Sequence, residues 1–127
     1  MSAKTAAVLI GVIFIAVGLL GYVDNPIVGD SGKAIFHAGS AHNIVHIASG
    51  ALFLLIAFAA PGAIGGFLKF FGILYLAIGI YGMTQMGSDD MKSLFGFLMV
   101  NKMDNYLHIG LGLVIFLAGF LRKPATA

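Results

Sequence analysis

Four long apolar stretches dominate the sequence and limit what it can fold into. The hydrocarbon core of a bilayer is about 30 Å thick and a helix rises about 1.5 Å per residue, so about 20 apolar residues make one crossing. The stretches are residues 5–23, 43–60, 67–86 and 104–121. They predict an all-α fold: a bundle of four transmembrane helices that forms a single membrane domain over residues 1–127.

The composition excludes most other classes of protein. Hydrophobic residues make up 60% of the chain, charged residues 9%, and the mean hydropathy is +1.03. Too little polar surface remains for a water-facing globule, a disordered chain or a nucleic-acid-binding domain. The absence of cysteine excludes disulfides, thiolate metal sites, iron–sulfur clusters and covalently attached haem. No activated-serine or phosphate-cradling motif is present in the sequence, so no catalytic residue is predicted.

The distribution of charge predicts the orientation in the membrane. The acidic residues lie in the first and third loops, with Asp104 at the boundary of the third loop and the fourth stretch, whereas the two termini and the second loop with the start of the third stretch carry only basic ones: Lys4, Lys69, Arg122 and Lys123. Since basic residues favour the cytoplasmic side, we expect both termini there. The first stretch exceeds the 7 to 15 residues or so of a signal-peptide core and lacks a small-x-small cleavage site before Asp24, so we expect it to remain as a helix.

The third loop contains a shorter apolar stretch, residues 91–100, which cannot span a bilayer. Asp89 and Asp90 precede it and are suited to capping a helix. We therefore expect this stretch to lie in the outer membrane interface.

A repeated motif divides the chain into two halves. Asn43–Gly50 and Asn105–Gly112 both read Asn-x-x-His-Ile-x-x-Gly, and each opens an even-numbered helix. The odd-numbered helices also match, because three glycines recur at a spacing of 61 residues: Gly11, Gly18 and Gly21 with Gly72, Gly79 and Gly82. Small residues of this kind allow helices to approach closely in lipid. The pattern predicts two tandem helical-hairpin repeats, residues 5–60 and 67–121, with His46 and His108 as partners at equal depth.

Three short motifs carry a resemblance to a known family. They are Asn43–Gly50 in the second helix, residues 71–75 (Phe-Gly-Ile-Leu-Tyr) in the third, and residues 104–108 (Asp-Asn-Tyr-Leu-His) at the start of the fourth. With them the chain resembles, over nearly its whole length, a bacterial family of small four-helix integral membrane proteins catalogued as a domain of unknown function. The resemblance implies the fold and no activity, and His37 and His42 lie outside its motifs. We expect the bacterial inner membrane as the location.

Polar side chains gather at the predicted outer ends of the helices. A transport path would need ionisable groups near the midplane, so transport is not favoured. The first interpretation is structural: the asparagines cap their helices and the histidines bond across the bundle, which joins the two hairpins. This polar clasp would consist of Asn43, His46, Asn105 and His108.

Two bound groups are alternatives to the clasp. His42 and His46 lie four residues apart on one helical face, as do Asp104 and His108. Three imidazoles, with Asp104 as fourth ligand or as the partner of a ligand, are suited to zinc, copper or nickel. His46 and His108 alone are suited to a b-type haem, whose axial ligands come from two helices at equal depth.

The sequence thus predicts a small, non-enzymatic integral membrane protein, a scaffold or accessory subunit without a cofactor. A metal-binding protein and a bis-histidine haem protein are the alternatives. Besides the lipid bilayer, the expected partners are further copies of the chain or a larger membrane complex, and no nucleic acid.

Overall fold

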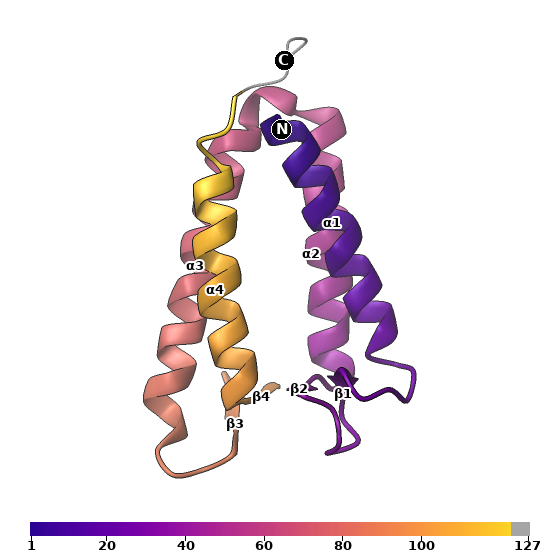
Figure 1. The fold of residues 1–127 in the computed structure, drawn as a ribbon, viewed down its shortest axis with the longest axis vertical. Coiled ribbons are helices and arrows are strands. Elements are labelled where there is room, and N and C mark those ends of the chain that lie inside the picture. The colour runs from indigo at the N-terminus through magenta and orange to yellow at the C-terminus, as the bar shows by residue number, and fades with distance from the viewer. Residues whose placement is uncertain (123–127) are drawn as a thin grey trace.

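The chain is mostly helical, with four helices that run antiparallel to their neighbours along one axis (Figure 1). The computed structural model describes residues 1–122. The helices are α1 (Ala3–Leu20), α2 (Ser40–Ala59), α3 (Ile64–Met86) and α4 (Lys102–Ala118), and the 3-10 turn η1 (Pro61–Ala63) joins α2 to α3. The first and last described residues lie at one end of the bundle, called the terminal end below, where the Ala3 N–H donates to the Arg122 carbonyl oxygen at 2.9 Å. The loops 21–39 and 87–101 form the opposite end, called the loop end.

Three of the described helices, α1, α2 and α3 extended by η1, are long and apolar enough to cross a membrane. The sequence predicted a fourth crossing, but α4 has 17 residues and is not among the helices that are long and apolar enough to cross a membrane. Its first turn is polar, with Lys102, Asp104 and Asn105. Large apolar side chains face outward on every helix, as expected of a surface in contact with lipid.

Facing glycines bring the helices together in two tight pairs, α1 with α2 and α3 with α4. A Cβ placed on Gly11 would lie 2.9 Å from the Gly50 carbonyl oxygen, and a Cβ on Gly112 would lie 2.7 Å from that of Gly72. Such distances leave no room for any side chain. Both pairs therefore rest on backbone-to-backbone contact at corresponding positions.

A second glycine contact lies at the loop end of each pair. A Cβ on Gly21 would overlap the side-chain oxygen of Asn43, and a Cβ on Gly82 would overlap that of Asn105. The two asparagines are almost completely buried, with 1% and 0% of their surface exposed. Glycine on the odd-numbered helix thus provides the space that an asparagine on the even-numbered helix fills.

An aromatic core joins the two helix pairs. Phe14 of α1 has its ring centroid 5.5 Å from that of Phe53, 6.2 Å from that of Phe71 and 5.4 Å from that of Tyr75. Phe53 of α2 also meets Phe71 edge-on, with centroids 4.7 Å apart. These contacts are worth about 0.5–1.5 kcal/mol each beyond the area they bury. The core therefore fixes one pair against the other.

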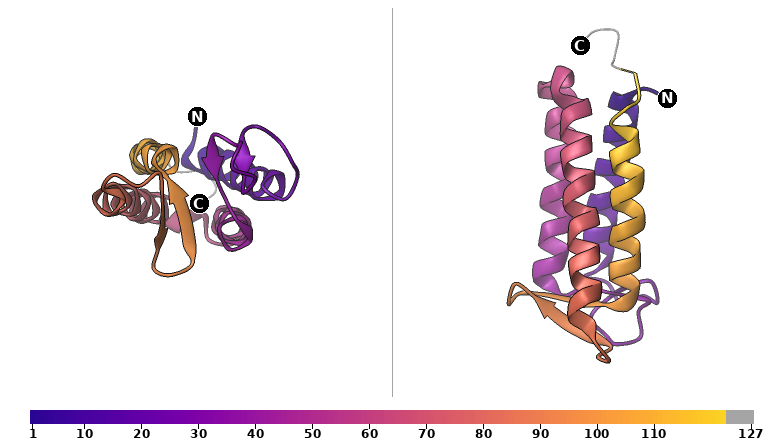
Figure 2. Two further views of the ribbon diagram at one scale, coloured as in Figure 1. Left: turned by 90° about the horizontal axis from the view of Figure 1, so that it is seen from below. Right: turned by 90° about the vertical axis from the view of Figure 1, so that its left-hand side faces the viewer.

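The loop end contains short strands where the sequence predicted only helices and loops. Strands β1 (Val28–Gly29) and β2 (Phe36–His37) pair in parallel, and β3 (Met91–Leu94) and β4 (Leu98–Asn101) form an antiparallel hairpin that projects from the bundle (Figure 2). The expectation that Asp89 and Asp90 cap a helix is wrong. An isolated helix of this length is marginal, and Gly96, with a φ of +81°, makes the tight turn that a hairpin needs.

We expect Gly112→Ala to destabilise the protein although alanine favours helix by about 1 kcal/mol. The new methyl group would meet the backbone of α3, and overpacking of this kind costs about 1–3 kcal/mol. Gly110→Ala in the same helix is the matched control, because, apart from the adjoining residues and backbone of α4 itself, no atom of residues 1–122 lies within 4 Å of a Cβ placed there. Thermal unfolding in detergent, followed by circular dichroism, measures both. Equal responses of the two variants would contradict the close contact.

Candidate metal centre

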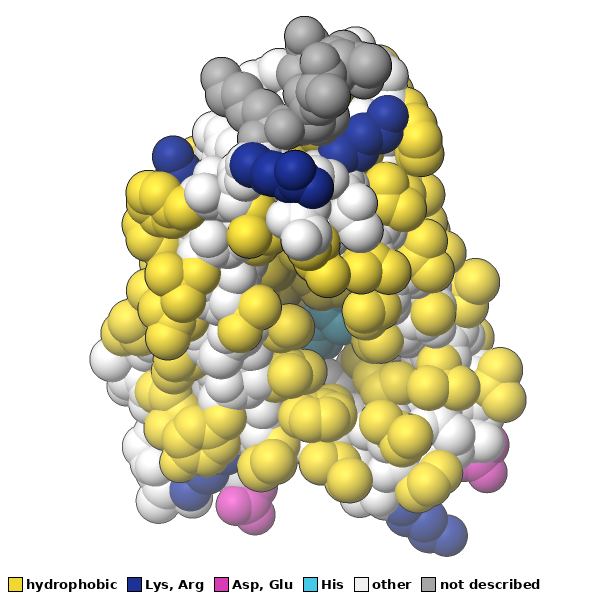
Figure 3. All heavy atoms as spheres, turned by 45° about the horizontal axis from the view of Figure 1, so that its top comes forward, with side chains coloured by type: hydrophobic (Ala, Val, Ile, Leu, Met, Phe, Trp, Pro, Cys, Tyr) yellow, Lys and Arg dark blue, Asp and Glu magenta, His cyan; other side chains and the backbone are white. Residues whose placement is uncertain are grey.

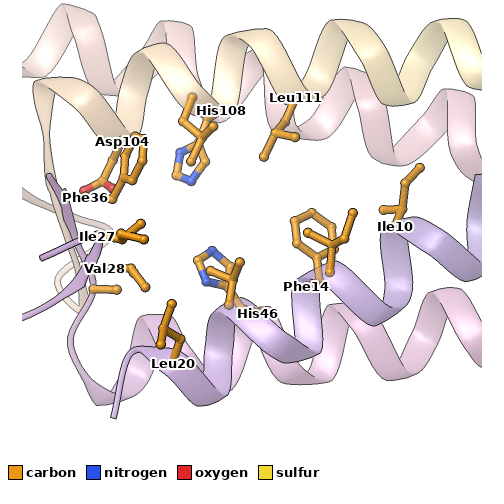
Figure 4. Close-up of a pocket in the computed structure, with 14 residues that line it drawn as sticks. Ile10, Phe14, Leu20, Ile27, Val28, Phe36, His46, Asp104, His108 and Leu111 are labelled. Carbon is orange, nitrogen blue, oxygen red and sulfur yellow. The ribbon is translucent and has the colours of Figure 1, made fainter. Parts of the chain in front are cut away.

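Three buried imidazoles converge at the loop end of the bundle. His42 and His46 come from α2 and His108 comes from α4. One nitrogen of each lies within 4.8 Å of one nitrogen of each of the others. The ring centroid of His42 lies 4.4 Å from that of His46 and 5.7 Å from that of His108. His46 and His108 point toward one another from opposite walls (Figure 4).

Helical spacing explains how two of these residues meet the third. His42 and His46 are four residues apart in α2, so they lie on the same face one turn apart. His108 takes the position in α4 that His46 takes in α2, three residues after the buried asparagine of its helix. The packing of Asn43 and Asn105 against their glycines therefore sets the rotation of α2 and α4 and, with it, the direction of both imidazoles.

The two asparagines are not helix caps, contrary to the prediction. The N-cap of α2 is Gly39 and that of α4 is Asn101, so each helix begins before its asparagine. Among residues 1–122, no hydrogen-bond partner is found for Asn43 Oδ1 or for either side-chain polar atom of Asn105. Their burial thus follows from packing in the space left by the glycines.

Asp104 caps its own helix and is not part of the imidazole group. Its Oδ2 accepts the Asn101 N–H at 2.8 Å, and its own N–H donates to Asn101 Oδ1 at 2.9 Å, which together form a capping box. The Asn101 side chain also donates through Nδ2 to the Ile35 carbonyl oxygen at 3.0 Å and so ties the two loops together. Sequence reasoning missed Asn101, although Asn-x-x-Asp before an apolar run is close to the known capping pattern.

The imidazole group has unused capacity for a ligand. The Nδ1 atoms of His42, His46 and His108 are buried, and none has a hydrogen-bond partner among the described residues. Leaving one such atom unpaired costs about 1–3 kcal/mol. Fewer than one-tenth of each side chain is exposed, so water alone has little access to them. A single bound ion or molecule could reach a nitrogen of each ring, because those nitrogens lie within 4.8 Å of one another.

Two aromatic rings support the imidazoles from the terminal side. Phe14 stacks on His46 with a centroid distance of 6.0 Å and an interplanar angle of 4°, and Tyr75 meets His108 edge-on at 5.2 Å. Both rings belong to the aromatic core and are buried. They restrict the rotation of the imidazoles. The spacing of 61 residues between Phe14 and Tyr75, the same as for the glycines, was the signal that could have identified this pair.

A cavity of about 290 Å³ adjoins His46 and His108 (Figure 4). Its remaining wall is apolar apart from Asp104, and α1 and α4 supply most of it. In the space-filling view a hollow among hydrophobic side chains exposes histidine at its floor (Figure 3). His42 is absent from the lining, so the cavity reaches the imidazole group from the side of the other two.

The haem alternative fits this geometry less well than a metal ion does. Two axial imidazoles of a haem must leave a flat macrocycle between them. Here His42 packs against both His46 and His108, so a third ring fills part of that space. His37, the remaining histidine, lies half-buried in β2 outside the group.

Comparison with protein families matches residues 4–121 to the family described as Domain of unknown function (DUF4383). The chain belongs to this family. The resemblance stated from the sequence motifs is confirmed at the level of a family of unknown function, and the match carries no activity with it. Neither the curated proteins nor the solved structures contain a match to the chain.

We expect Asn101→Ala to lower the free energy of unfolding by about 1–2 kcal/mol, because it removes both the cap of α4 and the bond to Ile35. Asn101→Ser is the matched variant, since a serine hydroxyl can still accept the Asp104 N–H but cannot reach Ile35. It should recover more than half of the loss. Hydrogen exchange at the first turn of α4 and thermal unfolding report the two effects. A serine variant as unstable as the alanine variant would contradict the role of the cap.

Proposed function

We propose that this protein is a membrane-embedded binding protein for one divalent transition metal ion, held by His42, His46 and His108. The observation that supports this is the convergence of three buried imidazoles, each with an unpartnered Nδ1. Three neutral imidazoles are a common ligand set, and binding a cation satisfies nitrogens that otherwise remain unpaired in an apolar interior.

The donor set limits which ions fit. Imidazole nitrogens suit zinc, copper and nickel, whereas magnesium and calcium prefer oxygen ligands. In a tetrahedral site with metal–nitrogen bonds of about 2.0–2.1 Å, the ligand nitrogens lie about 3.4 Å apart. Here the nitrogens of the three rings are up to 4.8 Å apart, and small rotations of the rings would bring them to the distance that a metal ion needs. With Asp104 engaged in the capping box, three ligands leave a fourth position for a water or another molecule.

The proposed orientation places the terminal end in the cytoplasm and the metal centre near the opposite face of the bacterial inner membrane. Basic residues at the terminal end support this. Lys4 lies over the Phe58 ring at 5.0 Å and Lys69 over the Phe120 ring at 4.2 Å, as long cationic side chains do when they reach along apolar surface toward headgroups. In this arrangement α4, although shorter, lies beside α3 within the bilayer.

We also attribute the two helix pairs to duplication of one hairpin. The corresponding glycine contacts of Gly11 with Gly50 and of Gly72 with Gly112 support this origin, as do the paired asparagines. His42 and Asp104 then occupy equivalent positions, 62 residues apart like Asn43 and Asn105.

A titration of purified protein with Zn²⁺ after treatment with a chelator tests the metal site. We expect one equivalent to bind and to raise the midpoint of thermal unfolding, because a ligand that binds only the folded state stabilises it by about 2.7 kcal/mol at 100 times its Kd. Co²⁺ should give the visible absorption of a nitrogen-ligated tetrahedral ion. Elemental analysis and an absorption spectrum of untreated protein identify a resident metal or a haem.

Single alanine substitutions of His42, His46 and His108 should each weaken zinc binding by at least about tenfold. Substitution of a residue that only hydrogen-bonds a metal ligand already lowers metal affinity by about this factor. His37→Ala removes the one histidine outside the group and is the matched control. Failure of zinc, copper and nickel to bind stoichiometrically would refute the proposal. If His46→Ala and His108→Ala then lowered thermal stability equally, the polar clasp of a scaffold or accessory subunit would be the better explanation.

A further inference from the structure

The cavity beside His46 and His108 is walled almost entirely by hydrocarbon. α1 contributes Ile10, Val17 and other apolar side chains, and α4 contributes Leu107 and Leu111. Among its described lining residues, only His46, His108 and Asp104 have polar side chains. Its volume of about 290 Å³ is close to the lower limit of small-molecule pockets, about 300 Å³, and a predominantly apolar wall with a few convergent polar groups is typical of them.

The cavity opens between α1 and α4, which are not partners in either glycine-based pair. The hollow in Figure 3 is surrounded by hydrophobic side chains. Large apolar residues of both helices are exposed beside it, among them Ile13 and Val114. If α1 and α4 lie in the bilayer, an occupant enters from the hydrocarbon and must itself dissolve in lipid.

The two imidazoles determine which chemical groups the inner end of such a molecule needs. His46 and His108 are 7% and 6% exposed, they point toward one another across the cavity, and their Nδ1 atoms lack partners among residues 1–122 (Figure 4). A bare alkyl chain would offer the ring nitrogens of His46 and His108 no hydrogen bond, which disfavours it as an occupant. The occupant therefore needs oxygen or nitrogen atoms that an imidazole, or a metal bound to it, can meet.

Charge excludes an anionic head. Among residues 1–122, no lysine or arginine lines the cavity, and Asp104 is part of its wall. In the metal-free protein, a phosphate or a fatty-acid carboxylate would be brought toward this acidic residue in an apolar environment without a cation to offset its desolvation. The head must be neutral.

We propose that the cavity binds a quinone with an apolar side chain, which directs one ring oxygen at His46 and His108 and extends its side chain between α1 and α4. A quinone ring is neutral and flat and carries an oxygen acceptor at its edge, which suits two imidazoles whose nitrogens lie within 4.8 Å of one another. Phe14, already stacked on His46, supplies an aromatic wall next to the ring. This assignment goes beyond metal binding and does not require it, since either an imidazole or the open position of a bound metal can meet a quinone oxygen.

Titration of the protein in neutral phosphatidylcholine nanodiscs with decylubiquinone tests the proposal. The chain has no tryptophan, and the Tyr75 ring lies 5.2 Å from His108, so quenching of tyrosine fluorescence reports binding near the imidazoles. We expect saturation at one equivalent. In the chelator-treated protein, dodecane, which has no head, and palmitate, which has an anionic one, should not displace the quinone.

Val17→Phe fills the cavity from α1 and should weaken binding by at least tenfold. Leu19→Phe makes a similar change on the same helix, but its side chain is exposed and does not line the cavity, so binding should be unchanged. His108→Ala should weaken binding roughly tenfold, as the loss of one buried hydrogen bond does. Circular dichroism verifies that each variant is folded, and Val17→Phe keeps the test decisive if His108→Ala fails to fold.

Quenching that does not saturate, or that is the same in Val17→Phe and Leu19→Phe, would overturn the proposal. So would displacement from the chelator-treated protein by dodecane or palmitate as effective as that by a second quinone. The titration is run with chelator-treated and with zinc-loaded protein: binding in either form supports the proposal, and absence from both refutes it. Quinone binding in a protein that binds no zinc would refute the metal centre alone.

Discussion

Contact between facing glycines is the constraint on which the rest of the structure depends. In lipid, apolar side chains gain little by leaving one neighbour for another, so helices associate through close packing of small residues. Each pair is held at the distance at which backbone meets backbone, and this distance leaves a space at the loop end that one buried asparagine fills. The asparagine fixes the rotation of its helix, and the histidine three residues later acquires a defined direction from it.

The two helix pairs share their backbone contacts but differ in chemistry at two corresponding positions. Phe14 stacks on one imidazole where Tyr75 meets the other edge-on. His42 contributes a third imidazole where Asp104 instead caps its helix. Similar halves therefore form an asymmetric site, with two nitrogen donors on one side and one on the other. A symmetric pair of hairpins would have offered two imidazoles facing each other and little else.

Most of the features that could be predicted from the sequence followed from its hydrophobic runs and its recurring residues. Run length located the helices, and the recurring glycines and Asn-x-x-His motifs indicated which positions would correspond, because close packing requires small residues at fixed intervals. The strands at the loop end escaped prediction because their pairing depends on turn geometry at Gly96 and on contacts between loops. The capping roles of Asn101 and Asp104 were not predicted, because a carboxyl group in the sequence can either cap a helix or bind a metal. Only the residue at which α4 begins distinguishes the two roles. The cavity depends on how the pairs are spaced, which no local pattern encodes.

Hydrogen bonds fasten the two halves at both ends of the molecule, among them Ala3 to Arg122 at one end and Asn101 to Ile35 at the other. Between these fastenings, α1 and α4 share no glycine contact within residues 1–122. The gap between these two helices is therefore bounded at both ends. A slender, flat molecule that lies along the helices fits such a gap, whereas a branched or globular one does not, whatever its affinity for the imidazoles.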